Sequence, residues 1–248
     1  MQNERKESLP LLQLLPNFVT IIGLCAGLTA IRFIIVGRFE VAATLIFFAA
    51  AIDGLDGLLA RKLNATSAIG AELDSLSDFL NFGVAPALMV YQAALTESYT
   101  TNWMFVLMYV ICACLRLARF NVNRNKPTIG AKPHFIGVPA PGGAALAMFP
   151  MILSFENMNW LTEYFYAYGI YLGFIGLLMA SSVPTLSSKS IRVPKDRAIF
   201  VLVGGALFAG LAITQFWKLV LIVTAAYMLV IAFNCLTYLA KLVRRPKP

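Results

Sequence analysis

Long apolar blocks constrain the fold of this chain more than any other feature of its sequence. We count eight blocks, at roughly residues 17–36, 40–61, 68–92, 101–120, 138–155, 163–182, 198–214 and 218–240. A helix needs about 20 apolar residues to span a bilayer, which is close to the length of these blocks. Transmembrane β-barrels give shorter segments of alternating hydrophobicity instead. The sequence therefore predicts an all-α, polytopic membrane bundle of about eight transmembrane helices.

Basic residues are placed so that they indicate the topology of this bundle. The chain has a net charge of +8, which by itself would be compatible with a nucleic-acid partner. The basic residues, however, gather before the first block and after the second, fourth, sixth and eighth, whereas the other connections hold few, such as Arg38 and Lys218. This is the positive-inside distribution. It predicts cytoplasmic termini, contact with membrane lipids and no nucleic-acid partner.

Two connections are longer than the rest and divide the chain. Residues 121–137 and 183–197 are polar, basic and rich in Pro, Gly or Ser, and the predicted topology places both in the cytoplasm. We expect residues 1–182 to form a six-helix core. Residues 183–248 would then be a cytoplasmic linker followed by an appended pair of helices.

Four of the five aspartates of the chain fall within residues 53–78, at the ends of two apolar blocks. One charged carboxylate at the centre of a membrane helix costs about 3 kcal/mol on insertion scales. Four that also repel one another need strong compensation, which bound divalent cations supply. This cluster is therefore the first candidate for a functional site.

The spacing of the aspartates puts each pair on one helical face. Asp53 and Asp56 are three residues apart on one predicted helix, and Asp74 and Asp78 are four apart on the next. The turn between the two helices is cytoplasmic, so both pairs lie near the same end of an antiparallel hairpin. Oxygen ligands without histidine or cysteine favour Mg²⁺, Mn²⁺ or Ca²⁺. We predict a metal-dependent site near the cytoplasmic face.

Two other interpretations of the cluster are compatible with the residues alone. The acids could pair with Arg61 and Lys62 and hold the bundle together, although four acids facing two bases leave an excess of negative charge. Alternatively, they could mark the ion pathway of a transporter, because intramembrane acids also occur there. The small residues Gly57, Ala60 and Gly70 leave space for a ligand or for another backbone.

Residues 53–78 read DGLDGLLARKLNATSAIGAELDSLSD. This segment resembles the signature of the CDP-alcohol phosphotransferase family, D-x2-D-G-x2-A-R-x8-G-x3-D-x3-D. All of its fixed positions match: Asp53, Asp56, Gly57, Ala60, Arg61, Gly70, Asp74 and Asp78. Pro16, Asn17 and Thr20 in the first block are also similar to the family. The helical layout extends the resemblance to residues 16–182, the catalytic membrane core that the family implies.

Three further stretches are most similar to the bacterial integral-membrane phosphatidylserine synthases of this family. They are NFGVAPA at 81–87, RLARFNV at 116–122 and FIGVPAPGGA at 135–144. The resemblance implies transfer of the phosphatidyl group from CDP-diacylglycerol to L-serine, at the cytoplasmic side of the bacterial inner membrane. Glycerol phosphate, inositol phosphate and choline are the alternative acceptors, and an ion or metal transporter is the remote alternative.

The resemblance also implies roles for the residues of the signature. Two divalent metals, Mg²⁺ or Mn²⁺, would be held, one by Asp53, Asp56 and Asp74, the other by Asp53, Asp74 and Asp78. Asp78 would also be the general base for the acceptor hydroxyl. The CDP-lipid would contact Asp56, Gly57, Ala60, Arg61 and Gly70. Members of the family are commonly homodimers, so we expect one here.

Independent chemistry agrees with these roles. Phosphoryl transfer depends mainly on positioning and charge neutralisation, and a carboxylate base helps a weak hydroxyl nucleophile. Beyond the signature, Arg116, Arg119 and Asn121 lie at the cytoplasmic end of the fourth block. They are candidates to bind serine or a phosphate through guanidinium and amide groups. The alternative is that the two arginines are topology anchors that extend to the interface.

Overall fold

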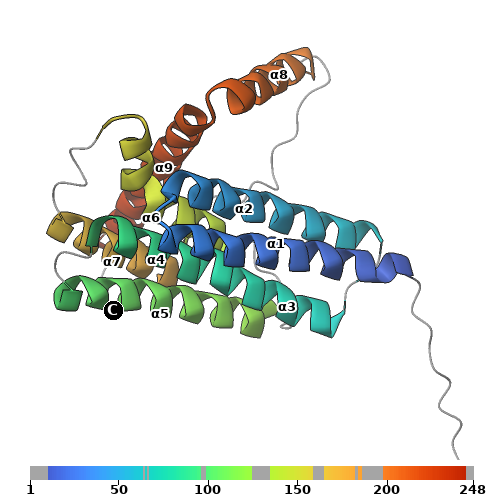
Figure 1. Cartoon of the computed structure of the whole chain (residues 1–248), viewed down its shortest axis with the longest axis horizontal. Coiled ribbons are helices and arrows are strands. Elements are labelled where there is room, and N and C mark those ends of the chain that lie inside the picture. Colours follow the sequence, from blue (N-terminus) through green and yellow to red (C-terminus); the bar gives the residue numbers. More distant parts are fainter. Residues whose placement is uncertain are drawn as a thin grey trace, which may run out of the picture.

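A computed structural model describes residues 11–63, 65, 67–95, 99–124, 135–158, 165–181, 184–185 and 198–243. Within them the chain is almost entirely helical, and each predicted apolar block appears as helix (Figure 1). The helices are α1 (Leu11–Ile35), α2 (Phe39–Lys62), α3 (Ala68–Asp78), η1 (Phe79–Val84), α4 (Ala85–Val90), η2 (Tyr91–Leu95), α5 (Tyr99–Arg124), α6 (Ala140–Phe155), α7 (Phe165–Ala180), α8 (Ala198–Thr214) and α9 (Phe216–Val243).

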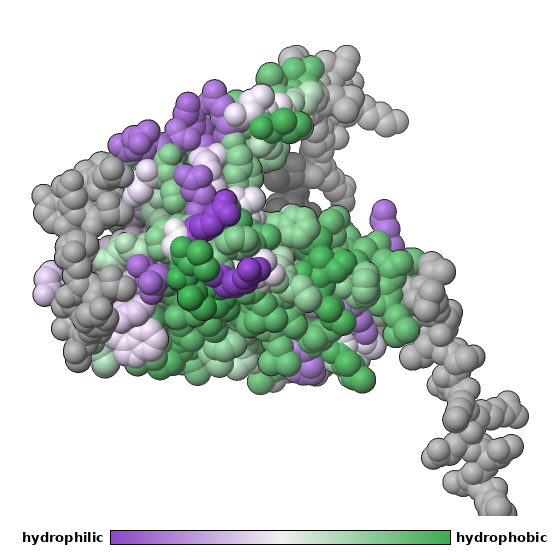
Figure 2. Space-filling model, viewed as in Figure 1, coloured by the Kyte–Doolittle hydropathy of each residue, from purple (hydrophilic) through white to green (hydrophobic). Residues whose placement is uncertain are grey.

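Four of these helices are long and apolar enough to cross a membrane. They include the segments Leu14–Ile35, Phe39–Lys62, Asn102–Asn123 and Phe216–Thr237, and α6, α7 and α8 contribute shorter apolar stretches. Figure 2 shows that hydrophobic side chains cover most of the visible face of the bundle. A surface of this kind suits a lipid environment and not water. The prediction of a helical membrane protein is confirmed, whereas the count of eight spans stays a prediction.

The first two helices, α1 and α2, form an antiparallel hairpin that brings the aspartates of α2 close to α1. Gly37 connects α1 and α2 with φ at +77°, a left-handed conformation that glycine adopts without steric cost. The two helices then pack along their lengths (Figure 1). Alanines keep this contact close, since Ala30, Ala42 and Ala43 are fully or almost fully buried. The C-terminal half of α2 is thereby held beside the start of α1.

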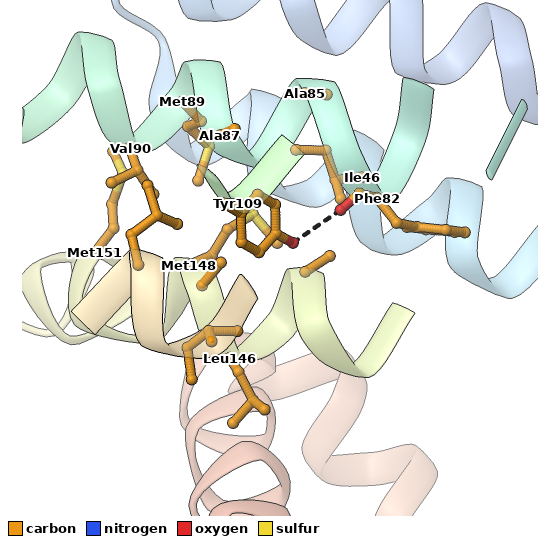
Figure 3. Close-up of a cluster of buried hydrophobic side chains, with 14 of the residues drawn as sticks. Ile46, Phe82, Ala85, Ala87, Met89, Val90, Tyr109, Leu146, Met148 and Met151 are labelled. Atoms are coloured by element: carbon orange, nitrogen blue, oxygen red, sulfur yellow. Dashed lines mark hydrogen bonds between the residues drawn. The ribbon is translucent and has the colours of Figure 1, made fainter. Parts of the chain in front are cut away.

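The third apolar block is not one regular helix. Directly after Asp78 the backbone widens into the π-helical turn η1, continues as α4, and ends in a second π-helical turn, η2. The Tyr109 hydroxyl from α5 donates a hydrogen bond of 2.9 Å to the Phe82 carbonyl within η1 (Figure 3). π-Helical turns often occur at functional sites, and η1 begins directly after Asp78, the last aspartate of the signature.

The two C-terminal helices differ in how they meet the rest of the bundle. Helix α8 extends away from it (Figure 1), and almost all of its described side chains are exposed. Helix α9 instead packs on α6, and it buries Leu221, Thr224 and Ile231. These residues recur at intervals of three, then seven, which places them on one helical face. Thus α9 shares the main hydrophobic core, although the division at residue 183 stays a prediction.

One departure from the all-α prediction is a pair of two-residue strands, β1 (Phe135–Ile136) and β2 (Pro184–Thr185). They pair antiparallel, with Phe135 opposite Thr185 and Ile136 opposite Pro184. Two residues are too few to give the alternating pattern by which a strand is found in a sequence. The pairing joins the two long connections, 121–137 and 183–197, at one point.

Candidate active site

Helices α2 and α3 bring the predicted carboxylates together. Asp53, Asp56 and Asp74 each offer a carboxylate oxygen, and these atoms lie within 4.8 Å of one another. Asp53 also lies within hydrogen-bonding reach of both Asp74 and Asp78. All four aspartates of the signature therefore meet in one cluster, with Asp53 at its centre.

A third helix contributes to this cluster through Thr20 of α1. Its hydroxyl oxygen lies 2.6 Å from Oδ2 of Asp56 and 3.1 Å from the Pro16 carbonyl. The hydroxyl has one proton, and the shorter contact to a charged acceptor is the stronger one. Asp56 is only 5% exposed, so the hydrogen bond fixes a carboxylate that the bundle has almost removed from solvent.

The carboxylates border a pocket between the first three helices. Its wall is formed by Pro16, Asn17, Thr20, Asp56, Gly57, Ala60, Ala65, Ser67, Gly70, Ala71 and Asp74. Four of the five residues predicted to contact a CDP-lipid are thus in the wall. The fifth, Arg61, lies beside it, because its Nη1 atom would be 3.6 Å from a methyl group added at Gly57. One side of the pocket is acidic, and the other side is lined by small residues.

The two signature glycines of the pocket have different structural reasons to be glycine. At Gly70, an added methyl group would collide with Oδ1 of Asn17 and would lie 2.9 Å from Oγ of Ser67. Ser67 caps α3 by accepting a hydrogen bond of 3.0 Å from the Gly70 amide. Gly57 meets only the end of the Arg61 side chain. Packing therefore requires glycine at residue 70, whereas at residue 57 it leaves space open in the pocket.

The candidate residues of α5 are placed at three different points. Asn121 accepts a hydrogen bond of 3.1 Å from Ser75, which directly follows Asp74 on α3. Arg119 donates a hydrogen bond of 2.9 Å to the carbonyl of Ala180, the last residue of α7. Arg116 lies close enough to Asp78 for the two charges to interact. Among the three, Arg116 is thus the one that faces the carboxylate cluster.

The donor set fits a divalent metal ion. Three carboxylate oxygens within 4.8 Å repel one another unless a cation or a proton lies between them. Carboxylates are the preferred ligands of Mg²⁺, Mn²⁺ and Ca²⁺, and the described part of the cluster holds no cysteine or histidine that would favour zinc or copper. The cluster is therefore able to bind a metal ion.

Comparison with known proteins agrees with this arrangement. The family model of the CDP-alcohol phosphatidyltransferases matches residues 13–180. A CDP-diacylglycerol–serine O-phosphatidyltransferase of Mycobacterium bovis is 37% identical over 226 residues, which cover 90% of this chain and 78% of that protein. A protein of the same name from Methanocaldococcus jannaschii is 31% identical over 214 residues, covering 85% of this chain and 90% of the relative.

A solved structure has the same fold. The crystal structure of phosphatidylinositol phosphate synthase from Mycobacterium tuberculosis with CDP-diacylglycerol bound superposes with a TM-score of 0.50. It is 19% identical in sequence, and the match covers 66% of this chain and 80% of that one. The likeness concerns the arrangement of helices, since identity at this level does not carry substrate or mechanism.

Proposed function

The chain belongs to the CDP-alcohol phosphatidyltransferase family, and we propose that it transfers the phosphatidyl group of CDP-diacylglycerol to the hydroxyl of L-serine, giving phosphatidylserine and CMP. The observation that carries the proposal is the meeting of Asp53, Asp56 and Asp74 within 4.8 Å at the edge of a pocket. The choice of serine is supported by the relatives named CDP-diacylglycerol–serine O-phosphatidyltransferase, which match 85–90% of this chain.

Two divalent ions, Mg²⁺ or Mn²⁺, would be held by this cluster. Asp53, Asp56 and Asp74 would bind one, and Asp53, Asp74 and Asp78 the other, so Asp53 and Asp74 would belong to both sets. When bound, such ions supply neutralisation of the diphosphate charge and stabilisation of the oxygens that enter and leave. Asp53 lies within hydrogen-bonding reach of both Asp74 and Asp78, which supports a shared role.

The pocket beside the cluster would hold the cytidine diphosphate part of the lipid. Gly57 and Ala60 have small side chains or none, so a nucleotide could approach the backbone of α2 closely at this wall of the pocket. Arg61, whose guanidinium lies over Gly57, would add a positive charge that faces phosphate or ribose oxygens. Gly70 would act indirectly, because it lets Asn17 and Ser67 close the other wall.

Asp78 would accept the proton of the serine hydroxyl. It lies at the end of α3, beside Asp53 and within electrostatic range of Arg116. A carboxylate in hydrogen-bonding contact with the incoming hydroxyl raises the nucleophilicity of that oxygen as it attacks phosphorus. The bond from phosphorus to the CMP oxygen then breaks, and CMP leaves as the anion.

The topology of the enzyme is part of the proposal. We propose eight transmembrane segments with both termini in the cytoplasm, so that the site opens toward the cytoplasm at the inner membrane of a bacterium. The acyl chains would stay in lipid, while serine reaches the site from water. Residues 1–182 would form the catalytic core and 183–248 the linker and appended helix pair. Homodimer formation stays a prediction that light scattering in detergent would test.

An acceptor panel tests the choice of alcohol. Purified protein, CDP-diacylglycerol and Mn²⁺ or Mg²⁺ are mixed in turn with L-serine, glycerol 3-phosphate, inositol phosphate or choline, and released CMP is measured. We expect CMP release with L-serine and not with the other three acceptors. CMP release with a different alcohol and not with serine would show that the protein catalyses the same transfer to another acceptor. No release with any of them would bring back the transporter interpretation.

Gly57→Ala is expected to weaken CDP-diacylglycerol binding by roughly 10-fold or more, since the new methyl group would occupy space of the pocket that the protein itself leaves empty. Stability should be unchanged or slightly higher, because alanine favours helix over glycine. Titration with CDP-diacylglycerol and thermal unfolding in detergent measure the two effects. Gly54→Ala on the same helix is the control, because no atom of the described residues lies within 4 Å of a methyl group there. Equal binding in both variants would place the nucleotide elsewhere.

Thr20→Val is expected to weaken metal binding by about 10- to 100-fold, as is typical when a ligand loses its supporting hydrogen bond. Valine keeps the shape of threonine but cannot donate to Asp56, which is buried. Mn²⁺ titration followed by electron paramagnetic resonance measures the change. Thr29→Val serves as the control, because within the described part of the chain that exposed hydroxyl bonds to the Cys25 carbonyl of its own helix. A normal Mn²⁺ affinity in Thr20→Val would show that Asp56 does not depend on this bond.

A further inference from the structure

Tyr227 of α9 lies outside the segment that the family model matches, which ends at residue 180. Its ring nevertheless lies against α6, within the catalytic part of the chain. A methyl group added at Gly142 would be 2.9 Å from the Cε1 atom and 3.1 Å from the hydroxyl oxygen of Tyr227. Gly142 therefore provides the space in which the phenol sits, and the phenol is held in the bundle interior.

The position of Tyr227 is fixed by the helix that carries it. Leu221 and Ile231, six residues before and four residues after it, are buried in the main core. Thr224, between them, is only 3% exposed. A tyrosine on a helix with such a buried face has little freedom to turn away, so its hydroxyl stays at one place.

Two polar groups in this region have no hydrogen-bond partner among the described residues. They are the hydroxyl of Tyr227 and the Nε atom of Arg116, and both atoms are inaccessible to solvent. Buried polar atoms in folded proteins are nearly always bonded to protein, water or a ligand. Two unbonded groups in one interior region therefore indicate a place where a further molecule completes the bonds.

Arg116 connects this region with the carboxylate cluster. It lies within electrostatic range of Asp78, of Tyr227 and of Tyr109. The hydroxyl of Tyr109 is already used, since it donates to the Phe82 carbonyl at 2.9 Å (Figure 3). The hydroxyl of Tyr227 is free of such a bond within the described structure. The groups available in this region are thus the Nε atom of Arg116, which lies within electrostatic range of Asp78, and the Tyr227 hydroxyl, which lies within electrostatic range of Arg116.

A guanidinium and a phenolic hydroxyl together donate hydrogen bonds suited to a carboxylate. We propose that Arg116 and Tyr227 form the acceptor subsite, where they hold the carboxylate of the amino acid whose hydroxyl Asp78 deprotonates. This rests on the proposed function, to which it adds the part of the substrate that is recognised. It also gives α9 a role, because the helix would supply a specificity-determining side chain to the core.

Tyr227→Phe tests the proposal, because it removes one oxygen atom and keeps the ring in the space beside Gly142. We expect KM for L-serine to rise on the order of 10- to 100-fold, the usual effect of losing a hydrogen bond to a charged group. The KM for CDP-diacylglycerol should stay unchanged. Preference for L-serine over ethanolamine, which lacks the carboxylate, should fall by the same factor, a change that general loosening of the bundle would not cause.

Tyr171→Phe is the matched control, because the hydroxyl of Tyr171 already donates to the Leu146 carbonyl at 2.7 Å. It should lower the unfolding temperature and leave the KM for serine as it was. An unchanged serine KM in Tyr227→Phe overturns the subsite while the proposed function stands. A raised KM for CDP-diacylglycerol instead would assign the pair to a lipid phosphate and also overturn it. Wild-type protein without serine-dependent CMP release would remove the proposed function, and the subsite with it.

Discussion

Asp78→Asn is expected to abolish measurable turnover, with a loss of at least about 10²- to 10⁴-fold, the usual contribution of a general base. The amide has the size of the carboxylate but cannot take up a proton from the acceptor hydroxyl. Binding of CDP-diacylglycerol should largely survive, because Asp78 is not in the wall of the pocket that would hold the nucleotide. The ion assigned to Asp53, Asp56 and Asp74 would also keep all three of its carboxylates. CMP release and a CDP-diacylglycerol titration on the same preparation separate the two effects.

Glu72→Gln is the appropriate control for this variant. Glu72 lies on the same helix, α3, and is exposed, so the same chemical change there should leave both turnover and binding as in the wild type. Normal turnover in Asp78→Asn would remove Asp78 as the base. Loss of CDP-diacylglycerol binding together with turnover would show instead that its main task is to hold the substrate complex.

Asp53→Asn is expected to weaken the binding of both metal ions severely and to eliminate turnover, which makes it the most damaging change in the cluster. A carboxylate oxygen of Asp53 lies within 4.8 Å of one from Asp56 and one from Asp74. Asp53 also lies within hydrogen-bonding reach of Asp78. An amide at this position would lower the charge available to both proposed ions. Each ion would lose a carboxylate ligand, so the Mn²⁺ stoichiometry should fall from two to below one at concentrations that saturate the wild type.

Titration with Mn²⁺, followed by electron paramagnetic resonance, measures this stoichiometry without substrate. Glu40→Gln, in the exposed first turn of the same helix, should bind Mn²⁺ like the wild type. If Asp53→Asn kept both the stoichiometry and the affinity of the wild type, the metal site would not be centred on Asp53. The roles of the four aspartates would then have to be assigned again.

Most helices of the membrane bundle could be predicted from the sequence because they coincide with apolar segments. The irregular third block could not be predicted in this way. Its first π-helical turn, η1, accepts a hydrogen bond at the Phe82 carbonyl from Tyr109, a residue 27 positions away along the chain. Hydrophobicity averaged over a window reports that a segment is apolar, but it does not report where the backbone widens.

The carboxylate cluster was predictable for a similar reason, since helical periodicity alone places Asp53 with Asp56 and Asp74 with Asp78. The interaction between Thr20 and Asp56 joins residues 36 positions apart, and spacing says nothing about such a contact. Arg119 shows the converse case. It was a candidate to bind substrate, yet in this structure it donates to the carbonyl of Ala180. A basic residue at a helix end has several possible partners, and only the packed fold selects one.

The role of the C-terminal helix was outside the reach of sequence reasoning. Nothing in the pattern of α9 distinguishes Tyr227 from other aromatic residues of a membrane helix, and Gly142 is far from it along the chain. Their contact exists because α9 packs on α6. A glycine that accepts a distant ring is recognised only when both helices are in place.

The most direct test of the central claim is the formation of phosphatidylserine by the purified protein from CDP-diacylglycerol and ¹³C-labelled L-serine, followed by mass spectrometry. The protein is first treated with a chelator and then resupplied with Mg²⁺ or Mn²⁺. We predict labelled phosphatidylserine and an equal amount of CMP only after metal is restored, and none with Asp78→Asn. Labelled product formed in full without a divalent ion, or no labelled product under any condition, would contradict the account.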